Sequence, residues 1–223
     1  MTDTNRRAPL TRERILSAAV DLADQAGLDA LTMRRLGSEL GVEAMSLYKH
    51  IANKEDILDG IVELVIGEIE IPSEGADWRE AMTRRATSAR KVLGRHSWAV
   101  GLFESRNSTG STVLRYVDSI LGSLRSAGFS VSDAAHAFWL LDSYVYGHVV
   151  QENSMSLETR NEKTEAVATS AEPPTAEEYP HLAEAQEDAL RTGYTFDGEF
   201  EFGLNLILDG LEKLRSSVPT DDA

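Results

Sequence analysis

Cysteine is absent from the 223 residues of this chain, so neither a disulfide bond nor a cysteine-ligated zinc or iron–sulfur site is possible. No apolar run approaches the roughly 20 residues that a membrane helix needs. The first nine residues are polar, include Arg6 and Arg7 and precede no apolar stretch, which is unlike a secretory signal. With 42% hydrophobic residues to form a core, a cytoplasmic protein is expected.

Basic residues are scarce, with 22 Lys and Arg against 37 Asp and Glu and a net charge of −15, which by itself argues against binding to nucleic acid. The imbalance is not uniform along the chain. Residues 1–54 contain 8 basic and 7 acidic residues, a net charge of +1, whereas residues 55–223 contain 14 and 30, a net charge of −16. Any binding of a polyanion is therefore expected in the first quarter of the chain.

Apolar residues recur at helical spacing along most of the chain, and no alternating strand pattern of useful length occurs, which predicts an all-α protein. Thr11 and Asn53 are expected to cap the first and fourth helices, and Gly27 to end the first. The connecting helix is expected over Asn53–Ile69. The other helices are expected at residues 11–26, 32–39, 43–49, 77–95, 97–103, 111–127, 131–153, 181–191 and 197–215.

The helical pattern breaks over residues 156–180, which contain three prolines and six glutamates. That composition predicts a mobile acidic loop. A partner-binding segment is the alternative, and a solvated linker is favoured over it.

Residues 32–49 have the pattern of a helix-turn-helix, in which two helices are joined by a short turn and the second enters the major groove. Leu36, Leu40 and Leu47 are expected to face the core. Small residues at the start of the second helix allow a close approach to base edges, and cations near helix N-termini suit phosphates. The candidate DNA contacts are Arg34, Ala44, Met45, Ser46, Tyr48, Lys49, His50 and Lys54.

This stretch resembles the DNA-binding domain of the tetracycline-repressor (TetR) family of bacterial regulators. The resemblance covers Leu10 to Leu58 and lies in Ile15-Leu16-x-Ala18-Ala19, Gly27, Leu31-Thr32-Met33-Arg34-Arg35-Leu36, Leu40-Gly41-Val42, Ser46-Leu47-Tyr48-Lys49-His50 and Asn53-Lys54-x-x-Ile57-Leu58. It implies that the eight residues above contact DNA. It also implies a homodimer with a four-helix interface, a helix-turn-helix domain over residues 1–58 and an effector-binding and dimerisation domain over residues 59–223.

The body resembles that family's C-terminal domain more loosely, nearest the tetracycline-repressor branch, at Trp78, Gly128-Phe129-Ser130 and Gly203-Leu204. Counting from Trp78 puts Phe103 where the founder has a magnesium-binding histidine. The same count puts Glu70 and Arg85 where the founder has polar drug contacts. A tetracycline–magnesium effector is therefore not expected.

Most aromatic side chains of the body are expected in the core or the dimer interface, and a minority could line an effector pocket together with polar residues. The pocket candidates are Phe103, Arg106, Trp139, Tyr144, His148 and Glu152. His148 and Glu152 could instead share a metal with His96 or His136. A hydrogen-bonded pair is the commoner reason for such spacing, so neither a metal nor another cofactor is expected.

These patterns predict a ligand-responsive dimeric transcriptional regulator, expected to be a repressor, that binds a palindromic operator through helix 43–49 and is released by a small molecule. One alternative is a helical adaptor that binds proteins rather than DNA. The other is an enzyme, which is disfavoured because no GxSxG motif, phosphate-binding glycine loop or pair of catalytic carboxylates is apparent.

Overall fold

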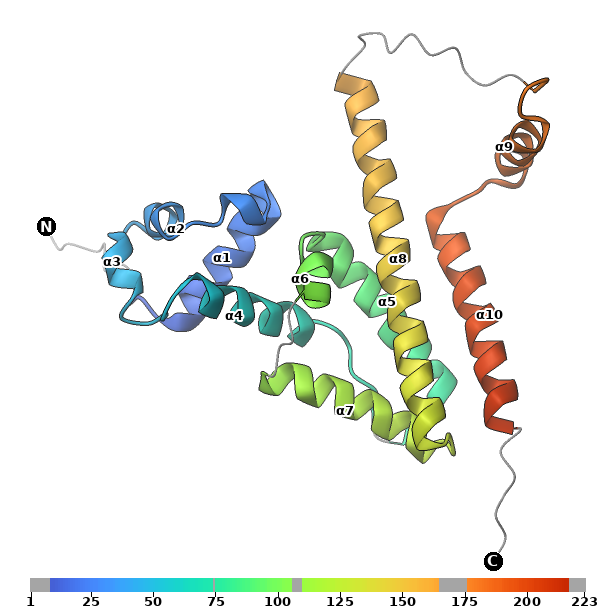
Figure 1. Ribbon diagram of the computed structural model, residues 1–223, viewed down its shortest axis with the longest axis horizontal. Coiled ribbons are helices and arrows are strands. Elements are labelled where there is room, and N and C mark those ends of the chain that lie inside the picture. The colour runs from blue at the N-terminus through green and yellow to red at the C-terminus, as the bar shows by residue number, and fades with distance from the viewer. Residues whose placement is uncertain (1–8, 74, 106–109, 165–175, 217–223) are drawn as a thin grey trace, which may run out of the picture. The chain divides into compact units, whose positions relative to one another are not determined.

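The computed structural model describes residues 9–73, 75–105, 110–164 and 176–216, and all secondary structure in these ranges is helical (Figure 1), which confirms the all-α prediction. None of the described helices is both long enough and apolar enough to cross a membrane. The helices are α1 Arg12–Ala26, α2 Met33–Leu40, α3 Ala44–Leu47, α4 Lys54–Gly67, α5 Trp78–Arg95, α6 Ala99–Ser105, α7 Ser111–Ser126, α8 Val131–Thr164, α9 Pro180–Thr192 and α10 Phe196–Ser216.

The predicted caps of the first and fourth helices are confirmed. The Thr11 hydroxyl accepts a hydrogen bond from the Arg14 amide at 3.2 Å, and the Asn53 side chain accepts one from the Asp56 amide at 2.9 Å. Gly27 ends α1 with a φ of 75°, a conformation that costs glycine little because it has no Cβ. A 3₁₀ turn at Leu28–Ala30, which the sequence pattern does not predict, follows directly.

The chain divides into two compact units, residues 1–149 and 150–223. In the first unit, α4 packs against α1 through one part of its length and against α6 and α7 through another. Figure 1 shows α1, α2 and α3 grouped near the beginning of α4. The side chain of Leu16 in α1 lies against Gly60 in α4, and Ile15, Leu22 and Ile61 of these two helices are buried. The position of α4 therefore links the helix-turn-helix to the rest of this unit.

The remaining helices of the first unit are α5, α6, α7 and the first part of α8. The rings of Trp78 and Phe129 meet edge to face with centroids 5.0 Å apart, which joins the start of α5 to the corner before α8. Along α8 the buried residues recur at helical spacing and are Ala134, Ala137, Phe138, Leu141, Asp142, Val145 and Val149.

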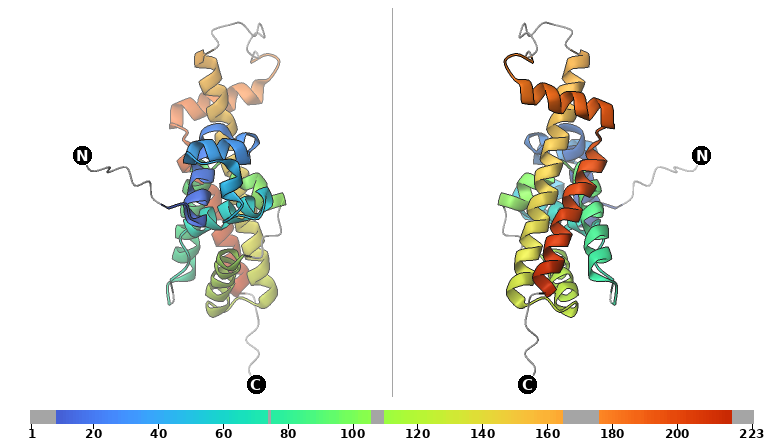
Figure 2. Two further views of the ribbon diagram at one scale, coloured as in Figure 1. Left: turned by 90° about the vertical axis from the view of Figure 1, so that its left-hand side faces the viewer. Right: turned by 90° about the vertical axis from the view of Figure 1, so that its right-hand side faces the viewer.

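The acidic loop predicted over residues 156–180 is wrong at its beginning, because α8 continues to Thr164 as one unbroken helix (Figure 2). Residues 154–164 contain neither proline nor glycine and are rich in Glu, Lys and Arg, which are good helix formers. A high acidic content therefore does not end a helix. The prolines at 173 and 174 lie outside the described residues, and Pro180 begins α9.

In the second unit, α9 has no buried residue, whereas α10 buries one face. The buried residues of α10 are Phe200, Leu204, Leu208 and Leu211. The sequence pattern places Ile207 and Leu214 on that face, but Ile207 is half-buried and Leu214 is exposed. A helix turns by 100° per residue, so a stripe over four turns drifts from a simple i, i+3, i+4 count.

Candidate nucleic-acid interface

The helix-turn-helix predicted over residues 32–49 is present. The Thr32 hydroxyl caps α2 by accepting a hydrogen bond from the Arg35 amide at 3.2 Å. Gly41 ends α2 in the left-handed region with a φ of 67°, and its amide is directed at the carbonyl groups of Gly37 and Ser38. The chain then turns through Val42 into α3, as the motif requires.

The helix predicted at residues 43–49 is shorter than expected, because α3 contains four residues, Ala44–Leu47. Glu43 occupies the N-cap in an extended conformation, and Tyr48 follows the last helical residue. The amides of His50 and Ile51 both donate to the Leu47 carbonyl, at 2.9 and 3.0 Å, so the segment closes into a turn. Residues 43–49 thus comprise the short helix α3 and the beginning of the turn that follows it.

Gly37 allows α2 and α3 to approach closely, and sequence reasoning missed this residue. A Cβ atom at Gly37 would lie 2.9 Å from the Val42 carbonyl oxygen and 3.2 Å from the Ala44 amide nitrogen. Both are backbone atoms, which cannot rotate away. A glycine inside an otherwise good helix is the signal that could have identified this contact.

The three leucines expected in the core, Leu36, Leu40 and Leu47, are buried. The eight candidate DNA contacts are all accessible. Met45 and Tyr48 have 74% and 46% of their surface exposed, and Arg34, Lys49, His50 and Lys54 are also exposed. Ala44 and Ser46 are half-buried, which is compatible with a close approach of the backbone to a partner. Their contact with DNA stays a prediction.

At the start of α4, Asp56 pairs with Arg12 of α1, and Lys54 is exposed. The Arg12 guanidinium lies 2.7 Å from the Asp56 carboxylate, which also accepts the Ala52 amide at 2.8 Å. The hydrogen bond from Arg12, followed by that from Ala52, lowers the pKa of Asp56. The negative charge of Asp56 is thus paired inside the domain. Lys54 is exposed two residues earlier at the N-terminus of α4, where backbone N–H groups favour an anion.

The middle of α4 is tied to α7 by a carboxylate. Glu63 accepts hydrogen bonds from the amides of Thr112 at 2.9 Å and Val113 at 3.3 Å, in the first turn of α7. Burial opposes the charged form of Glu63, but these bonds and that of the Thr112 side chain lower its pKa. A carboxylate at a helix N-terminus also interacts favourably with the helix dipole.

A second link joins α1 to the segment between α5 and α6. Asp24 of α1 accepts a hydrogen bond from the indole N–H of Trp98 at 2.6 Å and lies 2.8 Å from Nδ1 of His96. The other ring nitrogen of His96 is 3.5 Å from Glu68, at the end of α4, and Arg95 donates to the same carboxylate at 2.6 Å. Sequence reasoning missed this network, since its members are as far apart as residues 24 and 98.

The predicted effector-pocket residues lie at different places on the body. Trp139 is 68% exposed, whereas Phe103, Tyr144, His148 and Glu152 are half-buried. The ring of Phe103 lies 6.3 Å from that of Tyr146, and the ring of Tyr144 lies 6.1 Å from that of His148. Arg106 lies outside the described residues. Whether these residues form one site stays a prediction.

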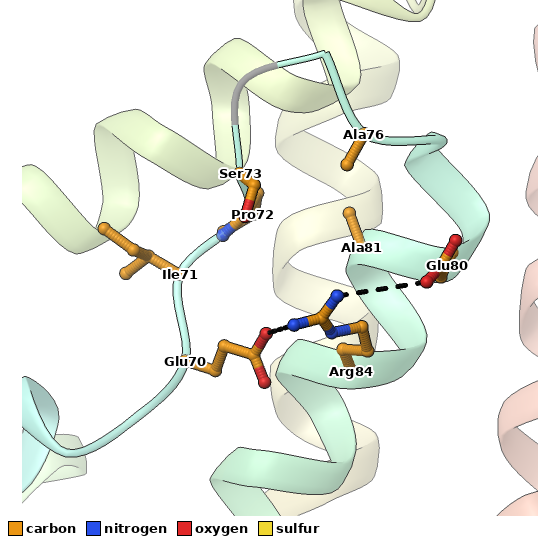
Figure 3. Close-up of a pocket in the computed structure, with 8 residues that line it drawn as sticks. All are labelled: Glu70, Ile71, Pro72, Ser73, Ala76, Glu80, Ala81 and Arg84. Atoms are coloured by element: carbon orange, nitrogen blue, oxygen red, sulfur yellow. Dashed lines mark hydrogen bonds and ion pairs between the residues drawn. The ribbon is translucent and has the colours of Figure 1, made fainter.

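Three hollows on the first unit do not contain these residues. Figure 3 shows one between the loop after α4 and the first turns of α5, where Arg84 pairs with Glu70 and lies 3.9 Å from Glu80. Its cavity volume of about 10 Å³ is far below the roughly 300–1,000 Å³ of small-molecule sites. The second hollow runs along α5 between Glu68 and Arg95, and the third lies between Pro72 and α7. About half of the lining surface of each is polar, unlike the predominantly apolar pockets that enclose drug-sized ligands.

A buried polar cluster lies deeper in the same unit. Arg85 of α5 is 1% exposed, and its Nη1 donates to the Tyr116 hydroxyl at 2.7 Å and to the Asp142 carboxylate at 2.6 Å. The Tyr146 hydroxyl lies 3.3 Å from the other oxygen of Asp142. The cluster therefore joins α5, α7 and α8.

Comparison with known proteins agrees with this architecture in both parts of the chain. Residues 15–61 match the bacterial regulatory proteins of the tetR family, and residues 71–215 match the tetracycline repressor-like C-terminal domain. The HTH-type transcriptional repressor DrrR1 of Streptomyces coeruleorubidus is 34% identical over 227 residues, which cover 95% of this chain and 83% of DrrR1. The tetracycline repressor protein class C of Escherichia coli is 30% identical over 209 residues, or 92% of each chain.

Solved structures of similar fold include two with bound small molecules. The Streptomyces coelicolor TetR family protein ActR in complex with actinorhodin has a TM-score of 0.73 at 29% identity, covering 92% of this chain and 98% of ActR. A TetR variant of Acinetobacter baumannii in complex with minocycline has a TM-score of 0.71 at 26% identity, covering 96% and 100%. With an exposed α3 and matches over both of its parts, the chain belongs to the TetR family of bacterial regulatory proteins and is a DNA-binding transcriptional regulator.

Proposed function

We propose that this chain is a cytoplasmic, ligand-responsive repressor that binds a palindromic operator as a homodimer. Residues 1–58 form the DNA-binding domain in this proposal, and residues 59–223 form the effector-binding and dimerisation domain. The observation that carries the proposal is the accessibility of α3 over a buried Leu47, within a helix-turn-helix that matches the family. Relatives named as repressors, and ActR bound to actinorhodin, support repression and its relief by a small molecule.

Each α3 enters the major groove at one half of the operator in this proposal. Met45 touches base edges or a thymine methyl group, and Ala44 and Ser46 allow the backbone to approach. Tyr48, Lys49 and His50 position the helix against phosphates, as does Lys54 from the start of α4. Arg34 reaches a phosphate or a guanine from α2. The net charge of −16 over residues 55–223 keeps the rest of the chain away from DNA.

Release follows from a change in the angle of α4. Two reading helices fit successive major grooves when their centres lie roughly 34–36 Å apart. α4 contacts α1 as well as α6 and α7, so an effector that shifts the body also shifts the DNA-binding domain. A preference of about 3 kcal/mol for the shifted state lowers operator affinity by about two orders of magnitude.

The operator-binding test uses a palindrome selected from a library of random duplexes. Tyr48→Ala and Lys54→Ala are expected to abolish retardation of this duplex in a gel, while sedimentation still detects the dimer. At low salt concentration, where residual binding of Lys54→Ala can still be titrated, this variant should show a salt dependence smaller by about two units in a dimer, since each phosphate contact contributes a slope of about 0.9. Lys91→Ala, in α5, is the matched control and should retain binding. Unchanged retardation by both variants would refute the proposed interface.

We further propose that the chain has no catalytic activity and needs no metal or other cofactor. Its relatives are named as regulators, and operator release requires only differential binding of an effector. Turnover of acyl or phosphoryl probes would contradict this part. The same salt titration distinguishes the regulator from the adaptor alternative. A protein-binding adaptor would show no detectable affinity for DNA at any salt concentration.

A further inference from the structure

The guanidinium of Arg85 is buried with only one of its three nitrogen atoms engaged. Nη1 donates its two hydrogens to Tyr116 and Asp142. Nε and Nη2 are shielded from solvent, and neither has a hydrogen-bond partner among the described residues. Buried polar groups are nearly always satisfied, because an unsatisfied charged donor is costly. The Nε–Nη2 edge of Arg85 therefore lacks a hydrogen-bond acceptor among the described residues.

The charges of the cluster show what this edge can bind. Burial alone would lower the pKa of Arg85, but Tyr116 and Asp142 raise it above its usual range, so the guanidinium is charged. Burial raises the pKa of Tyr116 to about 12, so its hydroxyl stays protonated at neutral pH. Arg85 is thus oriented by its Nη1 contacts, while its Nε and Nη2 donors lie parallel. That parallel pair matches the two oxygens of a carboxylate.

Aromatic rings adjoin the cluster. Tyr146, whose hydroxyl meets Asp142, has its ring 6.3 Å from that of Phe103. The guanidinium carbon of Arg85 also lies 5.8 Å from the centre of the Tyr116 ring. Aromatic faces bind flat apolar molecules and polarisable rings well. A ligand that satisfies Arg85 here would combine an acidic group with an aromatic body.

We propose that the effector of this regulator is an aromatic carboxylic acid whose carboxylate pairs with Nε and Nη2 of Arg85 and whose ring lies against Phe103 and Tyr146. This inference rests on the proposed function and adds the chemical class of the effector. Asp142 and Tyr116 position the guanidinium for the acid. The alternative is a purely structural Arg85–Asp142 pair that no ligand meets.

The first experiment compares acids with their neutral analogues on the unmodified full-length chain. The probes are 2-naphthoate and anthraquinone-2-carboxylate, each paired with its carboxamide. Because a bound ligand raises the unfolding temperature by mass action, at least one acid should raise it, with an affinity about 100-fold above that of its amide. Arg85→Gln should remove this preference, whereas the exposed neighbour Arg84→Gln should retain it. No acid-dependent stabilisation by either probe would overturn the proposal.

The second experiment distinguishes an acid-binding role of Arg85 from a purely structural one by whether a substitution tightens or weakens acid binding. Asp142→Asn keeps an oxygen for Nη1 but removes the negative charge that opposes a second carboxylate. Acid binding should therefore become about tenfold tighter in this variant. A structural pair predicts no such gain, so weaker or unchanged acid binding in a folded Asp142→Asn variant would contradict the proposal. Should this variant not fold, Tyr116→Phe removes one of the two hydrogen bonds that orient the guanidinium and should weaken acid binding about tenfold, and unchanged acid binding in this variant would contradict the proposal.

The effector inference and the proposed function fail separately. Retardation of the selected palindrome without any acid tests the regulator alone. If the palindrome is bound and no acid stabilises the chain, only the inference is wrong. If acids stabilise the chain and no duplex is bound, the acid site stands and the regulatory function is wrong.

Discussion

At the scale of single residues, the helix-turn-helix depends on positions where a side chain is missing or a charge is paired. Gly37 provides the space that the Val42 carbonyl and the Ala44 backbone occupy, and Gly41 adopts a φ of 67°. Asp56 caps the turn before α4 and pairs with Arg12 of α1. Each of these residues acts on the position of α3 or α4 rather than on DNA itself.

Gly37→Ala should destabilise the chain by about 1–3 kcal/mol, because the added methyl group overlaps backbone atoms and α3 must move. Operator affinity should fall together with stability, since the position of α3 sets how deeply this helix enters the major groove. Urea unfolding and gel retardation measure the two effects. Gly122→Ala is the control, because a Cβ there meets nothing within 4 Å, and it should stabilise α7 by about 0.5–1 kcal/mol. Equal effects of the two substitutions would refute the close-approach argument.

Asp56→Asn tests the pairing through pH. The pKa of Asp56 is lowered in the folded state, chiefly by the hydrogen bond from Arg12. Its contribution is therefore complete at a pH above its ordinary pKa of 3.8 and is lost as the pH falls through the lowered value. Asp56→Asn should be less stable than the unmodified chain at pH 7, and the difference should shrink towards pH 3.

Urea unfolding at several pH values measures that difference, with Glu39→Gln on the exposed surface of α2 as the comparison variant. A stability difference that stays constant from pH 7 to pH 3 would show that the charge of Asp56 is not involved.

At the scale of elements, α4 is the helix on which the two functions meet. Its first turn is paired to α1 through Asp56, its middle to α7 through Glu63, and the residue after its end to α5 through Glu68. A rigid helix with contacts at both ends passes a displacement from one end to the other. This arrangement gives the proposed release step a physical route through the described residues.

Glu63→Gln should weaken the link between α4 and α7. The neutral amide still accepts hydrogen bonds but loses the favourable interaction of a carboxylate with the α7 N-terminus, about 0.3–1 kcal/mol. Operator affinity without effector should change little, whereas the loss of affinity caused by a bound acid should become smaller. Retardation assays with and without 2-naphthoate measure this coupling. Unchanged coupling in this variant would exclude Glu63 from the route.

At the scale of the whole molecule, dimer formation has to cover apolar surface that one chain leaves exposed. Phe202 and Leu206, four residues apart on α10, are 63% and 58% exposed. Exposed apolar side chains in a contiguous stripe are typical of interfaces. A palindromic operator is bound by two DNA-binding domains, so the dimer interface is also required for tight binding to the operator.

Phe202→Glu should convert the dimer into a monomer at micromolar concentration, because it places a charge in an apolar interface. Sedimentation velocity measures the change, and retardation of the selected palindrome should be lost in parallel. Glu201→Gln, the exposed neighbour, should leave both properties unchanged. A dimer that survives Phe202→Glu would place the interface elsewhere.

The amino-acid sequence by itself determined the all-helical class, the caps at Thr11 and Asn53, and the helix-turn-helix over residues 32–49. These features are local, since a cap or a turn depends on residues within four positions of each other. The end of α8 was misjudged because acidic composition weakens a prediction of helix without preventing one. The candidate DNA contacts of the second helix also followed from local pattern, since Leu47 was the residue of that helix expected to face the core.

Only the tertiary structure decided which distant polar groups meet. Arg85 is 31 residues from Tyr116 and 57 from Asp142, and Asp24 is 74 from Trp98. No periodicity relates such positions, because their distance is set by how α5, α7 and α8 pack together, or how α1 packs against the segment between α5 and α6. The three-dimensional packing of apolar faces brings Arg85 and Asp142 into a region of low dielectric, where an unpaired charge would be costly.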